Sequence, residues 1–338
     1  MALLEIDDLH VSFKTVDGIV RAVDGVSLSL DGGRTLGIVG ESGSGKSVTA
    51  QTIIGLTRFP NATITGQIRF DGRDLVSMPT DDLRGIRGAR IAMIFQDPLS
   101  SLHPFYRVGS QIVEAIRTHE DVSRGTARRR TIEALRSVGI PSPEERFSSF
   151  PHEMSGGMRQ RVMIAMALAL RPDILIADEP TTALDVTVQA QVLELIQALR
   201  DDFGTAVILI THDLGVVSQM ADDVAVMYAG RVLEYAPREE LFAAPEHPYT
   251  WGLLQSIPRL DAPRTERLSP IAGSPPSLIR VPQGCTFHPR CPYAPPPAFE
   301  VEPELKESSP GHLVRCHLPV EERKRLWQSL QHEHPALR

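Results

Sequence analysis

The amino-acid sequence predicts an α/β fold in which a parallel sheet is interrupted by a helical insertion. Three observations predict it. The apolar strand 35–39 runs into a glycine-rich turn that opens a helical pattern. Residues 174–227 alternate short apolar strands with helical segments, as a parallel sheet requires. Residues 108–170 carry apolar positions at helical spacing and no strand pattern.

The elements follow in a definite order along the chain. Turn signals such as Asp17-Gly18 separate the first strands, which predicts an N-terminal antiparallel β subdomain. The expected strands are 3–6, 26–30, 35–39, 64–70, 91–95, 174–177, 206–210 and 224–227. The expected helices are 45–56, 81–85, 108–117, 126–138, 156–170, 186–200 and 214–220. We therefore predict a nucleotide-binding domain at 1–240, with its helical subdomain at about 97–172, and a proline-rich, largely irregular extension at 241–338.

Composition excludes several classes of protein. The 338 residues are 42% hydrophobic and 23% charged, and a formal net charge of -7 gives no electrostatic drive toward nucleic acid. The longest apolar run, residues 162–170, is far shorter than the roughly 20 residues that cross a bilayer. The acidic N-terminus does not resemble a signal peptide. We expect a protein that stays in the cytosol.

A phosphate-binding loop is the strongest motif. Residues 40–47, GESGSGKS, satisfy G-x-x-x-x-G-K-[ST] between a strand and a helix, which is the context of a P-loop NTPase. The glycines let backbone N–H groups surround phosphate oxygens, while Lys46 reaches the β- and γ-phosphates and Ser47 binds Mg²⁺. The predicted nucleotide-binding residues are Gly40, Ser42, Gly43, Ser44, Gly45, Lys46, Ser47 and Val48.

Two carboxylates end the apolar strand 174–177. Asp178 and Glu179 lie at the carboxyl edge of a buried parallel strand, where ligands of α/β sheets bind. Asp178 is predicted to hold Mg²⁺, and Glu179 to act as the general base that polarises the attacking water.

The segment 154–161, MSGGMRQR, precedes a predicted helix, and Ser155 is a plausible N-cap with two glycines behind it. With the two motifs above, this segment resembles the signature sequence of the ATP-binding-cassette family. The resemblance covers residues 3 to about 240 and implies a RecA-like core. It also implies that Ser155, Gly156 and Gly157 contact the γ-phosphate of a nucleotide bound to the opposite subunit. Met158 stands where most family members have glutamine, beyond the phosphate-contacting residues.

Further landmarks of the family appear in order. Gln96 resembles the glutamine that senses Mg²⁺ and the attacking water and begins the loop toward the membrane partner. The stretch Ala183-Leu184-Asp185 resembles the loop that crosses the dimer interface, and His212 resembles the histidine that touches the γ-phosphate and assists Glu179. Phe13 is the candidate for stacking on adenine, and a core phenylalanine is the alternative.

The resemblance implies an ATPase that powers an importer. Its implied partners are two transmembrane permease subunits, a second ATPase subunit, identical or homologous, and, indirectly, an external solute-binding protein, with no nucleic acid. The chain would then lie at the cytoplasmic side of the cell membrane. Two alternatives are a soluble cassette protein of DNA repair or translation and a non-enzymatic regulatory cassette. The long coiled coil or basic arm of the first is not visible, and the second is disfavoured by the full set of catalytic residues.

The extension indicates which branch of the family the chain resembles, and it contains all three cysteines. The stretches 246–258 and 101–104 resemble the oligopeptide/dipeptide/nickel uptake branch, with peptides the leading solutes and nickel or oligosaccharides open. Cys285, Cys291 and Cys316 resemble the branch's iron–sulfur segment, whose fourth cysteine is replaced near Ala298. A [4Fe–4S] cluster, a Cys₃His zinc site and no metal remain alternatives. The candidate histidines for zinc are His288, His312 and His317.

Overall fold

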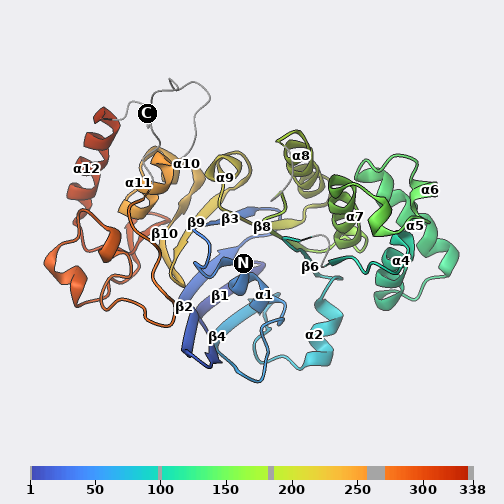
Figure 1. Cartoon of the computed structure of the whole chain (residues 1–338), viewed down its shortest axis with the longest axis horizontal. Coiled ribbons are helices and arrows are strands. Elements are labelled where there is room, and N and C mark those ends of the chain that lie inside the picture. The colour runs from blue at the N-terminus through green and yellow to red at the C-terminus, as the bar shows by residue number, and fades with distance from the viewer. Residues whose placement is uncertain (1, 98–100, 182–185, 257–270, 334–338) are drawn as a thin grey trace. The chain divides into compact units, whose positions relative to one another are not determined.

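The computed structural model describes residues 2–97, 101–181, 186–256 and 271–333, and they group into two compact units. Unit 1 comprises residues 1–30, 35–76 and 211–338, and unit 2 comprises residues 31–34 and 77–210. Figure 1 shows the helices and strands of both units.

Unit 1 begins with an antiparallel sheet, as the sequence predicts. Its strands lie in the order β2-β1-β4-β5, with β1 paired to both β2 and β4. Their bounds are β1 Leu4–Thr15, β2 Gly18–Leu30, β4 Ala62–Phe70 and β5 Arg73–Asp74. Alternate β1 residues such as Leu9 and Val11 are fully buried, which is the period-two pattern of a sheet with one covered face.

The second sheet portion of unit 1 carries the predicted phosphate-binding loop, residues 40–47. In the order β11-β12-β10-β9-β3, only the β9–β3 pair is parallel. The strands are β3 Thr35–Val39, β9 Asp223–Tyr228, β10 Arg231–Pro237, β11 Lys306–Ser309 and β12 His312–Val314. The helices of this unit are α1 Lys46–Ile53, α9 Leu214–Met220, α10 Arg238–Ala243, α11 Pro248–Gln255 and α12 Val320–Glu333.

The extension is more regular than its proline content predicts. Strand β12 pairs with β10, so the end of the chain extends the sheet of the core instead of forming an irregular tail. Helix α12 buries Trp327, and Phe287 and Cys285 belong to the same apolar cluster as Val39 and Tyr228. The extension therefore shares a hydrophobic core with the strands that flank the phosphate loop. The predicted domain boundary near residue 240 stays a prediction.

Unit 2 contains a parallel sheet portion and the predicted helical subdomain. Strands β6, β7 and β8 pair in parallel in the order β8-β7-β6. Helix α4 packs against both α5 and α7 (Figure 1). The strands are β6 Ile91–Ile94, β7 Ile174–Asp178 and β8 Ala206–Thr211. The helices are α2 Thr80–Ile86, α4 Val108–His119, α5 Arg124–Ser137, α6 Pro143–Arg146, α7 Gly156–Leu168 and α8 Val186–Phe203. Residues 108–170 contain no strand, as predicted.

None of the helices in the described ranges is long and apolar enough to cross a membrane.

Candidate active site

The predicted phosphate-binding loop, residues 40–47, lies between β3 and α1 in unit 1, and its backbone carbonyls accept hydrogen bonds from Lys46. The side chain of Lys46 is only 5% exposed, and its Nζ donates to the carbonyl oxygens of Gly40 at 2.7 Å and Glu41 at 2.9 Å. It also approaches Ser44 Oγ at 3.3 Å. The loop therefore presents a buried ammonium group at the start of a helix, where backbone N–H groups also favour anions.

Two glycines of the loop are required by close packing. Gly40 has φ 151°, and a Cβ there would lie 2.1 Å from the carbonyl oxygen of Met227. Gly45 has φ 100°, and a Cβ would lie 2.4 Å from the carbonyl oxygen of Ala22. Only glycine fits positions where backbone approaches backbone this closely in the left-handed region. Of the other predicted residues, Ser44 is buried, Ser42 and Gly43 are exposed, and Ser47 and Val48 are partly buried.

The predicted magnesium-sensing glutamine and catalytic base meet in unit 2. Gln96 follows β6, Glu179 follows β7, and Gln96 Nε2 donates to Glu179 Oε2 at 2.8 Å. The two residues are 83 positions apart in the sequence and come together because β6 and β7 pair in parallel. Asp178 is the last residue of β7 and is 3% exposed. The strand ends thus place an amide and two carboxylates at one edge of the sheet.

The backbone at Glu179 is held in an uncommon conformation. Its φ is 47°, in the left-handed region, and its N–H donates to the carbonyl oxygen of Ile210 at 2.9 Å, which prolongs the pairing of β7 with β8. A non-glycine residue in this region costs of order 1 kcal/mol and is enriched at functional sites. The hydrogen bond holds the turn that directs Glu179 away from the strand.

The remaining predicted residues lie at strand and helix ends. His212 directly follows β8 and is exposed, and Asp213 caps α9 by accepting from the N–H of Gly215 at 2.8 Å. Phe13 lies in β1 opposite Val20 and Ala62 and is partly buried, which leaves its two alternatives open. Asp185, with Ala183 and Leu184, lies outside the described residues.

The signature segment forms a capped helix start in unit 2. Ser155 Oγ accepts from the N–H of Met158 at 3.3 Å, so Ser155 is the predicted N-cap of α7. Ser155 and Gly156 are exposed, and Gly157 is partly buried. Gln160 anchors the helix by donating to the carbonyl oxygen of Pro180 at 2.6 Å. The backbone donors of residues 155–157 therefore lie at the positive end of a helix.

Comparison with known proteins decides the family. Residues 23–182 match the family described as "ABC transporter", and residues 233–297 match the family "Oligopeptide/dipeptide transporter, C-terminal region". The chain is 53% identical over 317 residues to the oligopeptide transport ATP-binding protein OppD of Bacillus subtilis, covering 94% of this chain and 88% of that protein. It is 52% identical to the dipeptide transport ATP-binding protein DppD of the same organism, covering 94% of each chain. OppD of Salmonella typhimurium is 51% identical, covering 95% of each chain.

The chain belongs to the ABC transporter family of ATP-binding proteins. Its relatives serve oligopeptide and dipeptide transport, which favours the transport class over soluble cassettes of DNA repair or translation. An ATPase activity that depends on MgATP follows from this membership.

Solved structures agree with the cassette fold. The ATP-binding cassette MJ0796, determined as a dimer bound to ADP and Pi, superposes with a TM-score of 0.63 at 26% identity, covering 70% of this chain and 98% of that one. The protein cbiO1 from Clostridium perfringens, part of an ABC transporter complex, gives a TM-score of 0.60 at 28% identity, covering 72% of this chain and 91% of that one.

In this ABC protein the three cysteines come together in the extension. Cys285, Cys291 and Cys316 line one cavity of about 20 Å³, and Ala298 lines it too. The N–H of Cys285 donates to the carbonyl oxygen of Ala298 at 2.9 Å, so the position expected to have lost the fourth cysteine adjoins the first. Burial raises the pKa of all three thiols, to about 12 for Cys291 and about 11 for Cys316.

As arranged, these thiols do not fit a bound metal. Within the described ranges no group of three or more His, Cys, Asp or Glu side chains is placed to hold a metal ion. The cavity, at about 20 Å³, has room for about one water molecule, which is far less than a four-iron cluster occupies. His288 and His317 also line the cavity, and each ring is hydrogen-bonded through one nitrogen to a backbone carbonyl, of Cys285 and Val301 respectively.

Two further histidines, His312 and His247, lie differently from what the sequence predicts for the cysteine segment. His312, one of the predicted candidates for zinc, does not line the cavity but pairs with Glu234 at 2.8 Å. His247 does line it and was missed, because a histidine in the stretch Glu246-His247-Pro248 is far in sequence from the cysteines. Burial lowers the pKa of His247 to about 3, so this ring is neutral.

Proposed function

We propose that this ABC protein hydrolyses MgATP to power import of dipeptides or oligopeptides through separate permease subunits at the cytoplasmic face of a membrane. The observation that carries the catalytic part is the hydrogen bond between Gln96 and Glu179 beside the buried Asp178. The transport part is supported by relatives about half identical to this chain whose names are those of peptide transport proteins.

The proposed roles of the residues follow from their chemistry. Lys46 and the loop N–H groups bind the β- and γ-phosphates, Glu179 accepts a proton from the attacking water, and His212 contacts the γ-phosphate. Gln96 holds the carboxylate of Glu179 in place and contacts the same water. Ser47, Gln96 and Asp178 each carry oxygen atoms, the donor type that Mg²⁺ prefers, and are the proposed ligands, with Asp178 acting through water. When bound, Mg²⁺ neutralises charge on the phosphates.

A second ATPase subunit completes each site in this proposal. The N–H groups of Ser155, Gly156 and Gly157 at the start of α7 bind the γ-phosphate held by the opposite subunit, with Asp185 contributing at the same interface. Support comes from the related cassette that was determined as a dimer in a post-hydrolysis state. The partner is an identical or a homologous subunit.

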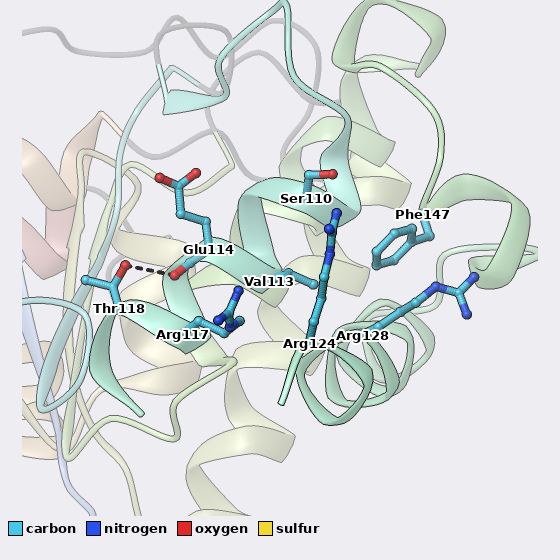
Figure 2. Close-up of a pocket in the computed structure, with 8 residues that line it drawn as sticks. All are labelled: Ser110, Val113, Glu114, Arg117, Thr118, Arg124, Arg128 and Phe147. Carbon is cyan, nitrogen blue, oxygen red and sulfur yellow. Dashed lines mark hydrogen bonds between the residues drawn. The ribbon is translucent and has the colours of Figure 1, made fainter. Parts of the chain in front are cut away.

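A charged cavity on the helical subdomain is the proposed face for a permease subunit. It has a volume of about 530 Å³ between α4 and α5, and Figure 2 shows Arg117, Arg124 and Arg128 around it. Its apolar wall is Val113 with Phe147, and the Arg128 guanidinium lies 5.0 Å from the Phe147 ring centre. A short acidic and apolar segment of the permease complements both the positive charge of the three arginines and the apolar wall.

One experiment tests the function and this face together. Co-expressed with its neighbouring permeases, the chain should follow them into detergent, and peptides delivered by a binding protein should stimulate its ATPase activity. Arg117→Glu with Arg124→Glu should abolish that association while the purified chain still binds ATP. Arg129→Glu is the matched control, since Arg129 is exposed on the same helix but does not line the cavity. If the variant with both substitutions still associates with the permeases, the proposed docking face is wrong. If peptides do not stimulate the ATPase activity, the proposed substrate class is wrong.

The iron–sulfur cluster stays a prediction. It is supported by the convergence of three cysteines and Ala298 around one cavity, and opposed by the cavity's size. Iron and sulfide measured on anaerobically purified protein decide it, with stoichiometric zinc as the outcome for a Cys₃His site and no metal as the third. If a cluster is present, Ala298→Cys should slow its loss in air.

A further inference from the structure

Two residues of the extension, Tyr249 and Arg290, hydrogen-bond to Glu41 of the phosphate loop. The N–H of Glu41 donates to Tyr249 Oη at 2.9 Å. The Glu41 carboxylate accepts from both guanidinium nitrogens of Arg290, at 2.5 Å and 3.1 Å. The Glu41 carbonyl oxygen accepts from Lys46, so its backbone and side chain are all held. Arg290 is 249 residues from Glu41 in the sequence, and the contact ties the end of the chain to the nucleotide loop.

The negative charge on Glu41 opposes the binding of phosphate by the loop. A carboxylate beside an anion-binding loop repels phosphate, and it is screened only where a cation lies close to it. The Arg290 side chain is 4% exposed and the Glu41 side chain 29%, so the pair is partly shielded from water. A bidentate arginine is the geometry that neutralises a carboxylate best.

Arg290 itself is fixed by the extension. It donates to the carbonyl oxygens of Ala272 at 2.9 Å and Ile271 at 3.2 Å, and its guanidinium lies 5.8 Å from the Tyr228 ring centre. Although burial alone would lower it, the pKa of Arg290 is raised by Glu41 and Tyr228, so the cation is permanent.

Tyr249 is fixed by an aromatic cluster that includes the cysteine segment. Its ring packs on Tyr228 at 4.8 Å and on Phe287 at 5.3 Å between ring centres. Phe287 lies between Cys285 and Arg290 in the sequence, so the segment 285–291 positions both of the groups that hold Glu41. Burial raises the pKa of Tyr249 and keeps its hydroxyl neutral, which suits an acceptor for the Glu41 N–H.

We propose that Arg290 is a positioning residue for ATP binding: it neutralises Glu41 and, with Tyr249, sets the conformation of the phosphate loop from the C-terminal extension. The inference rests on the proposed role of residues 40–47 as the ATP-binding loop. Arg290 touches neither phosphate nor the attacking water in this proposal, and it acts through Glu41.

The test measures binding of MgATP, with a fluorescent N-methylanthraniloyl-ATP probe, to the purified full-length chain. Arg290→Gln leaves the Glu41 carboxylate without its arginine and should weaken binding about tenfold, within the range of typical coupling between sites. Adding Glu41→Gln removes the repelling charge, and the double variant should recover at least about threefold of that loss. In the assembled transporter, Arg290→Gln should raise KM for ATP while kcat stays within about twofold.

Controls separate this role from simple loss of stability. Arg315→Gln removes another largely buried arginine of the extension, which pairs with Glu302 and has no hydrogen bond to the loop, and should leave ATP affinity unchanged. Should Arg290→Gln not fold, Arg290→Lys keeps the charge and loses the bidentate geometry, and a smaller loss of affinity is expected.

The outcomes also distinguish this inference from the function on which it rests. If Lys46→Ala leaves ATP binding intact, the assignment of the loop fails. If Lys46→Ala abolishes binding but Arg290→Gln or Arg290→Lys binds as tightly as the unmodified chain, the positioning role is overturned. A double variant that binds no better than Arg290→Gln also overturns it.

Discussion

Gln96 donates a hydrogen bond from its side-chain amide to the carboxylate of Glu179 at 2.8 Å. The bond joins the loop after β6 to the turn after β7, and Glu179 is held there with a left-handed backbone. A carboxylate fixed at the end of a parallel strand is well placed to act on a water molecule without prior rearrangement.

Glu179→Gln tests the general base. The amide oxygen of glutamine still accepts from Gln96, so the local geometry is retained while the proton acceptor is lost. ATP turnover in the assembled transporter should fall at least about 10²-fold, with ATP affinity unchanged, and the nucleotide should be trapped between closed subunits. Turnover close to that of the unmodified protein would assign the base to another residue.

Lys46→Ala tests the phosphate loop. The substitution removes the cation and also the hydrogen bonds to Gly40 and Glu41 that close the loop around it. Affinity for MgATP should fall by at least about tenfold, measured by equilibrium binding to the purified chain. Lys306→Ala is the matched control, because this lysine lies in β11 with an exposed side chain.

Sequence alone predicted the order of the core because its signals are local. The capping serine of α7 and the strand before Asp178 each lie within a few residues of the element they define. The strand β12 was not predicted, since it has three residues and its partner β10 lies far earlier in the chain.

The contact between Arg290 and Glu41 was invisible for the same reason. Neither residue has a local pattern that selects the other across 249 positions, and only the shared core of the extension and β3 brings them together. Helix α12 did leave a signal, because the apolar residues Leu326, Trp327 and Leu330 lie at helical spacing, with Leu330 four positions after Leu326 and three after Trp327. The proline content of the preceding segment obscured it.

Gly157→Asp tests whether two subunits share each site. A carboxylate at the start of α7 would face the γ-phosphate of the opposite subunit, so ATPase activity of the complex should fall at least about tenfold while the variant chain still binds ATP in its own loop. A Cβ at Gly157 would lie 3.2 Å from Val188, whereas one at Gly156 meets nothing within 4 Å. Gly156→Asp therefore repeats the charge without the steric conflict, and full activity in both variants would contradict the shared site.

The pH dependence of stability tests the buried network that holds the extension to the core. Burial by itself lowers the pKa of His312, but its hydrogen bond to Glu234, together with the charges of Glu246 and Glu240, outweighs burial and raises the pKa above 6.5. Since the folded state binds this proton more tightly than the unfolded state, the stabilisation is complete below about pH 6.5 and is lost as the pH rises through the folded-state pKa. Glu234 is fully buried, and His312 shares it with the N–H groups of Glu246 and His247, which also donate to its carboxylate.

His312→Gln keeps a hydrogen-bond donor for Glu234 and removes the titration. Its destabilisation, measured by urea unfolding with tryptophan fluorescence, should be about 1–3 kcal/mol at pH 6 and smaller at pH 8.5. Both tryptophans, Trp251 and Trp327, lie in the extension and report on this region. If the difference in stability between His312→Gln and the unmodified chain did not change with pH, His312 would not be charged in the folded protein.

The buried, neutral His247 should show the opposite pH dependence of stability. Because its pKa is lowered to about 3, the stability that it contributes is lost as the pH falls below about 6.5. His247→Gln should therefore remove part of the loss of stability at low pH, measured by the same urea unfolding.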